Sequence, residues 1–440
     1  MEQLARRIDS SRWTRAHGLI FTSTSLGMLI WGLEATIGPA GYLVFHKSIL
    51  FLVAYYALDI MGDLVIARLS DMSLARKGAF YLTMSMIGAG LLVLGFDIAL
   101  TGGRGLGAVL VGLLGAALMK VGIEGDVPVS LAFLAENTPA RHRTRVLVLG
   151  PNFANVGAAL GSAILLLTYS STSSYLYAAY SLIAVTLAVL GVTFAVRVSM
   201  PESVRWLLEK GAAGRASREA ERLSAEPVHE VREVTPTVGL WGRYAFLAVL
   251  GVVQYLTYGL MAFTIAYFYY SGATIYLIML VANVAASLAG LPAAFLPDVM
   301  DSRDFSVLAY VGGLASIGLI AVALAELNQQ AFLSAFYPLL FVNMFFSELA
   351  WAVRTIYEPL LFPTNVRATM IGLVRVAPIL SYDVSLYVTS SWTEWQFVAF
   401  NSALWGVGAL AAVVWRLVGY DVRRALLESV SSPRAGRAAV

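Results

Sequence analysis

The chain contains no cysteine and only four histidines in 440 residues. Without cysteine it has no disulfides, no thiolate nucleophile and no cysteine-based metal site, and the scattered histidines form no metal-binding motif. The sequence also shows no nucleophile–base arrangement and no phosphate-binding glycine loop. We therefore expect a protein that is not an enzyme and that carries neither a metal nor another cofactor.

Charge is scarce as well, since Asp, Glu, Lys and Arg make up 13% of the residues against 59% hydrophobic ones. The mean hydropathy is +0.75. Apolar runs of about 20 residues, enough to cross a hydrocarbon core roughly 30 Å thick, recur along the chain. The sequence predicts an all-α, multi-pass protein in the lipid bilayer of the cell membrane. Its twelve predicted transmembrane segments are 18–42, 49–67, 78–98, 105–135, 146–168, 174–196, 241–268, 272–296, 305–325, 331–361, 367–390 and 395–415.

A polar stretch over 198–240 divides these segments into two sets of six. We expect an N-terminal six-helix bundle over 1–197, a linker with amphipathic helices over 198–240, and a C-terminal bundle over 241–440. Most of the 30 lysines and arginines lie in the termini and the loops on their side, whereas only Lys47 and Arg104 lie in the opposite loops. The positive-inside rule then predicts that both termini are cytoplasmic. The net charge of +3 and the lack of a basic patch exclude a nucleic-acid partner.

The two halves repeat each other. Residues 67–76, ARLSDMSLAR, and 294–303, AFLPDVMDSR, both fit A-x-L-x-D-x-x-x-x-R after the second helix of their half. At nearly the same offset, Pro139 and Arg143 match Pro363 and Arg367, and Glu124 matches Glu348. Two sequence matches that occur in the same order and at nearly the same offset indicate duplication of a six-helix unit in parallel topology.

Charges inside the fourth segment mark a candidate transport path. Lys120, Glu124 and Asp126 fall within seven residues, and each embedded charge costs about 2.5–3.5 kcal/mol on the insertion scale. Lys120 and Glu34 lie at the same depth, roughly 24 Å from the cytoplasmic edge at 1.5 Å per residue. We predict that they pair while Glu34 is ionised and separate when it is protonated, which would couple protons to transport. The alternative is a static ion pair that only fixes helix packing.

The two acidic residues of this segment, Glu124 and Asp126, lie on different faces of the helix. Glu124 follows Lys120 by four residues and shares its face, so it can neutralise the lysine locally. Asp126 lies about 240° round the helix from Lys120. It is either part of the transport path or a packing carboxylate beside Pro128.

In the second half, Arg354 and Arg375 both lie about 13 Å from the inner edge. These cations need anions, which come either from neighbours such as Glu358 or from a carboxylate on the substrate, since arginine suits bidentate carboxylate binding. Further candidates for contact with a small polar solute are aromatic and amide side chains. They are Gln254, Tyr255, Tyr258, Asn343 and Trp351.

Four motifs resemble the major facilitator superfamily. ARLSDMSLARK (67–77) is similar to its G-x-L-x-D-R-x-G-R-K loop, with Ala67 for glycine and one extra residue before Arg76 and Lys77. PESVRWLLEKG (201–211) closely resembles the PESPRWL signature of the sugar porters and related metabolite:proton symporters. AENTPARHR (135–143) and YEPLLFPTNVR (357–367) resemble the E-x-x-P-x-x-x-R of the same branch.

The resemblance extends to the coupling residues but also departs from the family pattern. GLEATIG resembles the G-Y-D of proton-coupled sugar porters, which puts Glu34 on their proton-binding aspartate. GIEGDVPVS (122–130) resembles the G-G-D-Y-P-L-S of phosphate:proton symporters, although their helix 7 aspartate is missing. Leu360 occupies the helix 10 glutamate position, Gln254-Tyr255 retains half of a glutamine pair, and the C-terminal P-E-T is absent.

What the resemblance implies is a secondary transporter that works as a monomer by alternating access. It would move a small polar metabolite, a sugar or an organic acid, in symport with protons. Phosphate symport and proton antiport stay open, and a non-transporting membrane sensor on the same fold is a different class. The cytoplasmic charges would form gates that open and close. The alternative is that these charges only keep the loops on the cytoplasmic side of the membrane. These predicted gate residues are Asp71, Arg76, Lys77, Glu136, Arg143, Glu202, Arg205, Asp298, Arg303 and Arg367.

Overall fold

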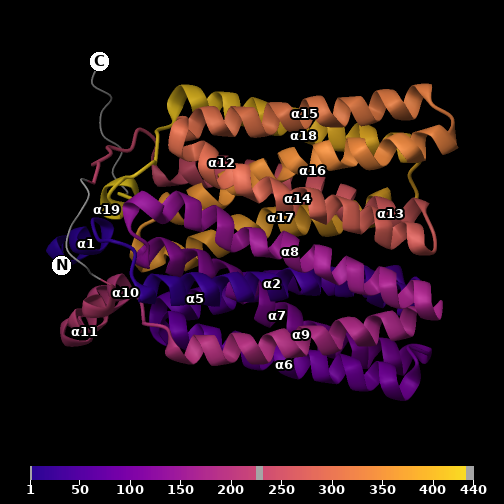
Figure 1. Ribbon diagram of the computed structural model, residues 1–440, viewed down its shortest axis with the longest axis horizontal. Helices are drawn as coiled ribbons and strands as arrows, with labels where there is room; N and C mark the ends of the chain where they lie inside the picture. The colour runs from indigo at the N-terminus through magenta and orange to yellow at the C-terminus, as the bar shows by residue number, and fades with distance from the viewer. Residues whose placement is uncertain (1, 224–230, 433–440) are drawn as a thin grey trace.

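The computed structural model describes residues 2–223 and 231–432, so parts of the predicted linker (224–230) and of the C-terminal tail (433–440) lie outside it. Long helices run side by side along one axis (Figure 1). Large apolar side chains such as Leu100, Leu167 and Leu410 are more than half exposed on their outer faces. This is the surface expected of helices in lipid, where the membrane replaces a polar solvent.

The helices follow the predicted segments within a few residues. In the first half they are α2 (Arg15–Val44), α3 (Ile49–Ala57), α4 (Asp59–Met61), η1 (Gly62–Ile66), α5 (Ala67–Leu69), η2 (Ser70–Leu74), α6 (Ala75–Thr101), α7 (Gly105–Asn137), α8 (Ala140–Thr172) and α9 (Tyr175–Ser199). In the second half they are α12 (Leu240–Gly259), η3 (Leu260–Thr264), α13 (Ile265–Tyr269), α14 (Ala273–Val299), α15 (Ser302–Glu326), α16 (Gln329–Leu360), η4 (Thr364–Val366), α17 (Arg367–Thr389) and α18 (Glu394–Val418).

Within the described ranges, eleven helical stretches are long and apolar enough to cross a membrane, and one of them, Phe51–Thr101, holds two predicted segments. Contacts with α7 show that this stretch crosses twice. Asp59 lies beside Lys120, Asp71 lies with Arg76 near Glu136, and the chain then returns past Met119 at Gly90. The described chain therefore makes the twelve predicted passes.

The reversal between the second and third passes has an unusual backbone. Ser70–Leu74 form a π-type turn, which is the usual way a helix accommodates an inserted residue. Ala75 follows with φ 58° and ψ −176°, a region that almost only glycine occupies and that costs other residues about 1–3 kcal/mol. The chain thus reverses through a π-type turn followed by a strained residue, Ala75.

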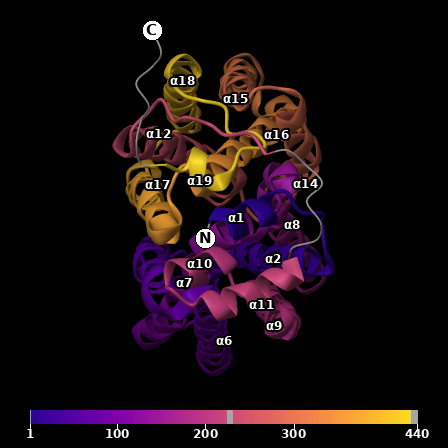
Figure 2. The same ribbon diagram turned by 90° about the vertical axis from the view of Figure 1, so that its left-hand side faces the viewer.

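Figure 2 shows helices α2 to α9 on one side of the bundle and α12 to α18 on the other. We call these sides the N half and the C half. They meet mainly where α8 packs on α14 and where α17 packs on η1 and α7. The duplicated sequence therefore produces two helix groups with one long interface between them.

The first and last described helices, α1 (Glu2–Asp9) and α19 (Leu427–Val430), lie at the same end of the bundle, together with α10 (Val204–Glu209) and α11 (Ala213–Leu223) (Figures 1 and 2). We call it the linker end. The linker helices α10 and α11 were predicted from the polar stretch, whereas α1 and α19 were not. Asp9 of α1 and Glu428 of α19 contact Arg143 of α8 and Arg205 of α10, as described below.

Glycines permit close packing of α2 on α8. A Cβ at Gly157 would lie 2.1 Å from the backbone oxygen of Leu29, and one at Gly161 would lie 2.4 Å from Oγ1 of Thr36. Gly32 of α2 is the reciprocal position, because a Cβ there would lie 1.8 Å from the backbone oxygen of Ala154. This approach sets the distance between the helix that carries Glu34 and its neighbour α8.

The Gly157→Ala variant should therefore be less stable. Its Cβ meets backbone rather than a flexible side chain, and overpacking of this kind costs about 1–3 kcal/mol. We expect a clear fall in the melting temperature of the purified protein in detergent. Gly191→Ala is the control, because nothing lies within 4 Å of a Cβ at Gly191. Equal melting temperatures for the two variants would contradict the packing argument.

Candidate functional site: a buried ion-pair network and two cavities

Lys120 on α7 lies at the centre of the N half and is 2% exposed. Its Nζ lies 2.8 Å from Asp59, 3.2 Å from Glu34 and 3.7 Å from Glu124. Tyr55 donates its hydroxyl to Glu34, and its ring lies 4.8 Å from Nζ. The pairing with Glu34 predicted from equal depth is therefore present, as is the predicted approach of Glu124, and Asp59 is a third carboxylate partner.

Glu124 connects this centre to the C half. One carboxylate oxygen accepts a hydrogen bond of 2.8 Å from the indole of Trp31, and the other pairs with Arg375 on α17. Arg375 also lies 2.8 Å from Asp63 of η1. An arginine of the C half is thus inserted between two carboxylates of the N half.

The charges of this central cluster do not balance. We define it as Glu34, Asp59, Asp63, Glu124, Lys120 and Arg375. All six side chains are at most 2% exposed. If every group were ionised, four carboxylates would face two cations. Such an excess is costly in a medium of low dielectric constant, and protons are the simplest way to remove it.

Asp126 does not belong to the central cluster. Both of its oxygens lie 2.7 Å from Arg197 of α9, in a bidentate pair, and Thr83 and Ser130 donate to them at 2.7 and 3.2 Å. Every partner comes from the N half. Of the two interpretations of this residue, the geometry agrees with a packing carboxylate that joins α6, α7 and α9.

The first cavity lies between the central cluster and the C half. Glu34, Lys120 and Glu124 line it from one side. Aromatic side chains, among them Trp31, Tyr255, Tyr258 and Tyr382, line the remainder. A solute in this cavity would be in direct contact with the groups that are candidates for proton binding.

A second cavity shares Trp31, Tyr255 and Tyr258 with the first. Gln254 and Trp351, both predicted contacts, also line it. The rings of Trp31 and Trp351 stack across the two halves at 5.9 Å. Four of the seven predicted substrate residues therefore surround the cavities.

The other three predicted substrate residues are engaged elsewhere. Asn343 donates to Ser316 at 2.9 Å between α16 and α15. Arg354 pairs with Glu358 at 2.7 Å and donates to Gln254 at 2.6 Å, and Arg375 belongs to the central cluster. Both arginines thus have carboxylate partners within the chain. This agrees with the alternative in which their counter-ions are neighbouring residues rather than a carboxylate of the substrate.

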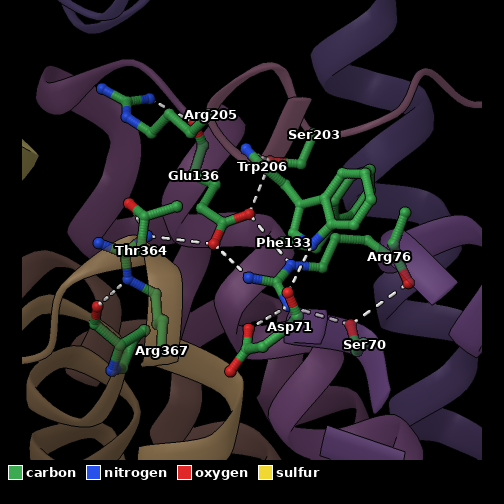
Figure 3. A network of polar contacts seen from close by, with 12 residues as sticks. Ser70, Asp71, Arg76, Phe133, Glu136, Ser203, Arg205, Trp206, Thr364 and Arg367 are labelled. Carbon is green, nitrogen blue, oxygen red and sulfur yellow. Dashed lines mark hydrogen bonds and ion pairs between the residues drawn. The ribbon is translucent and has the colours of Figure 1, made fainter. Parts of the chain in front are cut away.

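Figure 3 shows a second ion-pair network, at the linker end. Arg76 lies 2.7 Å from Asp71 and 2.6 Å from Glu136. From the C half, Arg367 reaches Glu136 at 3.1 Å, and Thr369 donates its backbone N–H and its hydroxyl to Asp71 at 2.8 and 2.7 Å. We call these five residues the linker-end gate, because their contacts join the halves.

The remaining predicted gate residues separate into two kinds. Asp298 crosses between the halves to Arg145, while Arg303 pairs with Asp301 of its own half at 2.8 Å. Glu202 stays within the N half, where it accepts from the backbone N–H groups of Arg76 and Lys77 at 3.2 Å. Burial raises the pKa of the Glu202 carboxyl although these donors lower it. Its geometry is that of a cap on the first turn of α6.

The terminal helices form a third set of contacts at the linker end. Asp9, the last residue of α1, pairs with Arg143 and lies 2.8 Å from Arg205. Glu428 of α19 lies 2.7 Å from Arg205. Burial raises the pKa of Glu428, but the charge of Arg205 and its hydrogen bond lower it more, to about 2. The helices α1 and α19 are thus both tied to predicted gate residues.

At the opposite end of the bundle the halves meet through aromatic rings. Tyr42 of α2 lies 5.5 Å from Tyr267 of α13, and Tyr169 of α8 lies 5.7 Å from Tyr276 of α14, between ring centroids. The two cavities therefore have ion pairs on one side and aromatic contacts on the other.

Sequence reasoning missed several members of these networks. Asp59 and Asp63 are charges within an apolar segment, so the argument used for Lys120 could have found them. Arg197 stands near the end of α9, just outside the predicted segment 174–196, so the sequence places it in a loop. Asp9 and Glu428 carry no local signal, since only the tertiary fold brings the chain termini to Arg143 and Arg205.

Comparison with known proteins agrees with this architecture. The model of the Major Facilitator Superfamily matches residues 16–378. Among solved structures, the proton:xylose symporter XylE bound to 6-bromo-6-deoxy-D-glucose aligns with a TM-score of 0.74 at 15% identity, over 94% of this chain and 98% of that one. Inward-open XylE from E. coli gives 0.66 at 14% identity, over 93% and 98%.

A bacterial homologue of the iron transporter ferroportin, in an outward-facing state, gives a TM-score of 0.60 at 14% identity, over 92% of this chain and 98% of that one. No curated protein matches the sequence. At such low identity the structural likeness shows the fold alone.

The linker-end gate should open when Glu136 loses its charge. Glu136→Gln removes the carboxylate that holds Arg76 and Arg367. In this chain without cysteine, spin labels on introduced cysteines at the exposed positions Arg68 and Asn365 report the distance between the halves. We expect the distance distribution to shift to longer values, and no shift for Glu209→Gln on the exposed face of α10. An unchanged distribution in Glu136→Gln would show that the gate does not hold the halves together.

The contact between Glu428 and Arg205 should resist acid. Because the pKa is lowered in the folded state, the stabilisation is complete above the unfolded value of about 4.3 and is lost as the pH falls through about 2. The difference in melting temperature between the wild type and Glu428→Gln should stay constant from about pH 8 to 5 and shrink at lower pH. A difference that vanishes between about pH 7 and 5 would contradict the lowered pKa.

Proposed function

This chain belongs to the major facilitator superfamily and is a multi-pass membrane transporter, and we propose that it couples a small, non-anionic polar metabolite to protons. A sugar is the favoured substrate class. The observation that carries this proposal is the position of Glu124, whose carboxylate is shared between Lys120 and the Arg375 of the other half. Protonation within the N half can therefore change, through Glu124, a contact between the two halves.

The charges around the cavities favour a sugar over an organic acid or phosphate. Binding of an anion would need a cation that lacks a carboxylate partner. Arg354 and Arg375 are both paired with carboxylates of the chain, and Lys120 lies among three of them. A neutral solute can use the aromatic faces and the Gln254 amide without adding to the excess of negative charge.

The composition of the central cluster supports proton coupling. When Glu34 or Asp59 takes up a proton, Lys120 loses an anionic partner and its attraction to Glu124 becomes relatively stronger. Glu124 then holds Arg375 less firmly. The link between α7 and α17 weakens, and the halves can separate on that side of the cavities.

In this proposal the linker end faces the cytoplasm, as the distribution of basic residues predicts. The linker-end gate and the terminal contacts hold the cytoplasmic side closed, and they must break for release into the cell. Alternating access needs such reversible contacts at each end, with the solute site between them. The division into an N-terminal bundle, a linker and a C-terminal bundle supplies the two bodies that move.

The direction of coupling is tested by the sign of the pH gradient. Symport predicts faster uptake into proteoliposomes when the outside is acidic, whereas antiport predicts faster uptake when the inside is acidic. A panel of labelled sugars, amino sugars and organic acids under both gradients identifies the substrate class. A membrane sensor without transport would give no uptake with any of them.

Glu34→Gln should uncouple protons from transport. Gln keeps the size of the side chain and can accept from Tyr55, but it cannot ionise and pair with Lys120. We expect that a pH gradient no longer drives uptake, while exchange of labelled for unlabelled substrate at equal pH continues. Glu326→Gln, at an exposed helix end, serves as the control. Uptake by Glu34→Gln that still follows the pH gradient would exclude Glu34 as the coupling group.

A further inference from the structure

The second cavity contains a carboxylate that the proton mechanism does not use. Glu348 of α16 is 2% exposed, and it accepts a hydrogen bond of 2.5 Å from Asn155 of α8 through one oxygen. Its other oxygen has no hydrogen-bond partner among the described residues. No lysine or arginine of the described ranges forms an ion pair with it. Arg354 is paired with Glu358, and Arg375 is paired with Asp63 and Glu124.

Two further polar atoms around this cavity lack partners in the described part of the chain. They are the indole nitrogen of Trp351 and the hydroxyl oxygen of Ser347, on side chains that are 7% and 1% exposed. Both residues line the cavity with Glu348. Buried polar groups are nearly always hydrogen-bonded, so three unsatisfied groups around one cavity indicate that a ligand or water completes them.

The three groups define what such a ligand must offer. The indole N–H needs an acceptor, the hydroxyl can give or take a hydrogen bond, and the carboxylate needs a donor that also carries positive charge. Burial of an ion without a counter-ion is strongly unfavourable, and a cationic ligand would remove that cost. The rings of Trp31, Tyr255, Tyr258 and Trp351 around the cavity add faces that attract cations.

We propose that the second cavity binds a small organic cation that also carries hydroxyl groups, with Glu348 as its counter-ion. An amino sugar has this chemistry. The inference rests on the proposed transport function and narrows its substrate class from sugars to hydroxylated amines. Glu348 holds the ammonium group, while Trp351 and Ser347 contact the hydroxyl groups.

The arrangement of Asn155 supports a positioned rather than an incidental carboxylate. Asn155 also donates to Asn152 at 3.0 Å, and Asn152 donates to the backbone of Ser287 on α14 at 3.0 Å. A Cβ at Gly290 would lie 2.1 Å from the Asn152 amide. The carboxylate is thus held by a chain of amides that crosses the interface between the halves, where a ligand could affect their separation.

Equilibrium binding to the purified protein in detergent tests the proposal without a pH gradient, so its result is independent of proton coupling. The probes are glucosamine and choline as cations and glucose as the neutral counterpart of glucosamine, at a mildly acidic pH where the amine is protonated. We expect glucosamine to bind at least about tenfold more tightly than glucose, which corresponds to about 1.4 kcal/mol. Choline tests the charge without the sugar ring and should also bind.

Glu348→Gln keeps the size of the side chain and its hydrogen bond to Asn155 but removes the charge. It should abolish the preference for glucosamine and leave the affinity for glucose within about twofold. Without ligand its melting temperature should equal or exceed that of the wild type, because an unpaired buried charge has been removed. Glu326→Gln should bind all three probes like the wild type.

Several results would overturn the proposal. Equal binding of glucose and glucosamine, or binding of neither cation, would contradict a cation site, while pH-driven sugar uptake would still support the transport function. Glucosamine binding that survives in Glu348→Gln would exclude Glu348 as the counter-ion. A marked loss of stability in the variant without ligand would assign the carboxylate a structural role instead.

Discussion

The structure depends on the requirement that charges inside a membrane must be paired. Lys120 and Arg375 are buried at a depth where water cannot stabilise them, and each is surrounded by carboxylates. Glu124 lies between the two cations and connects helices of opposite halves. Because breaking a buried pair leaves an uncompensated charge, the halves cannot separate at this level unless the charge changes. Protonation is a change that the surplus carboxylates make available.

The same two helices carry the centre and the linker-end gate. On α7, Lys120 and Glu124 lie in the centre and Glu136 lies at the linker end, while on α17 Arg375 and Arg367 occupy the corresponding levels. A movement of α17 relative to α7 would therefore strain both sets of pairs together. At the opposite end the halves meet through tyrosine rings, which carry no charge. We infer that charge controls one side of the cavities and packing controls the other.

The fold could be predicted from the sequence because each transmembrane helix is a long apolar run with its own local signal. Depth counting also placed Glu34 beside Lys120, since a helix converts residue number into distance. Rotation about the helix axis separated Asp126 from that pair, but its partner Arg197 depended on how α9 packs. Repeat symmetry aligned Arg303 with Arg76, yet Arg303 pairs with Asp301, a neighbour that has no equivalent in the first half. Pairing between helices is a tertiary property that neither periodicity nor symmetry determines.

The most direct test of this account is infrared spectroscopy of carboxyl groups in the purified protein. The central claim is that four carboxylates share two cations, so the cluster holds at least one proton at neutral pH. We predict a protonated-carboxyl C=O band at neutral pH that shifts in heavy water. The part of this band that comes from the central cluster should be lost in a Glu34→Gln, Asp59→Asn double variant. A spectrum in which this double variant leaves the protonated-carboxyl region unchanged at neutral pH would contradict the claim.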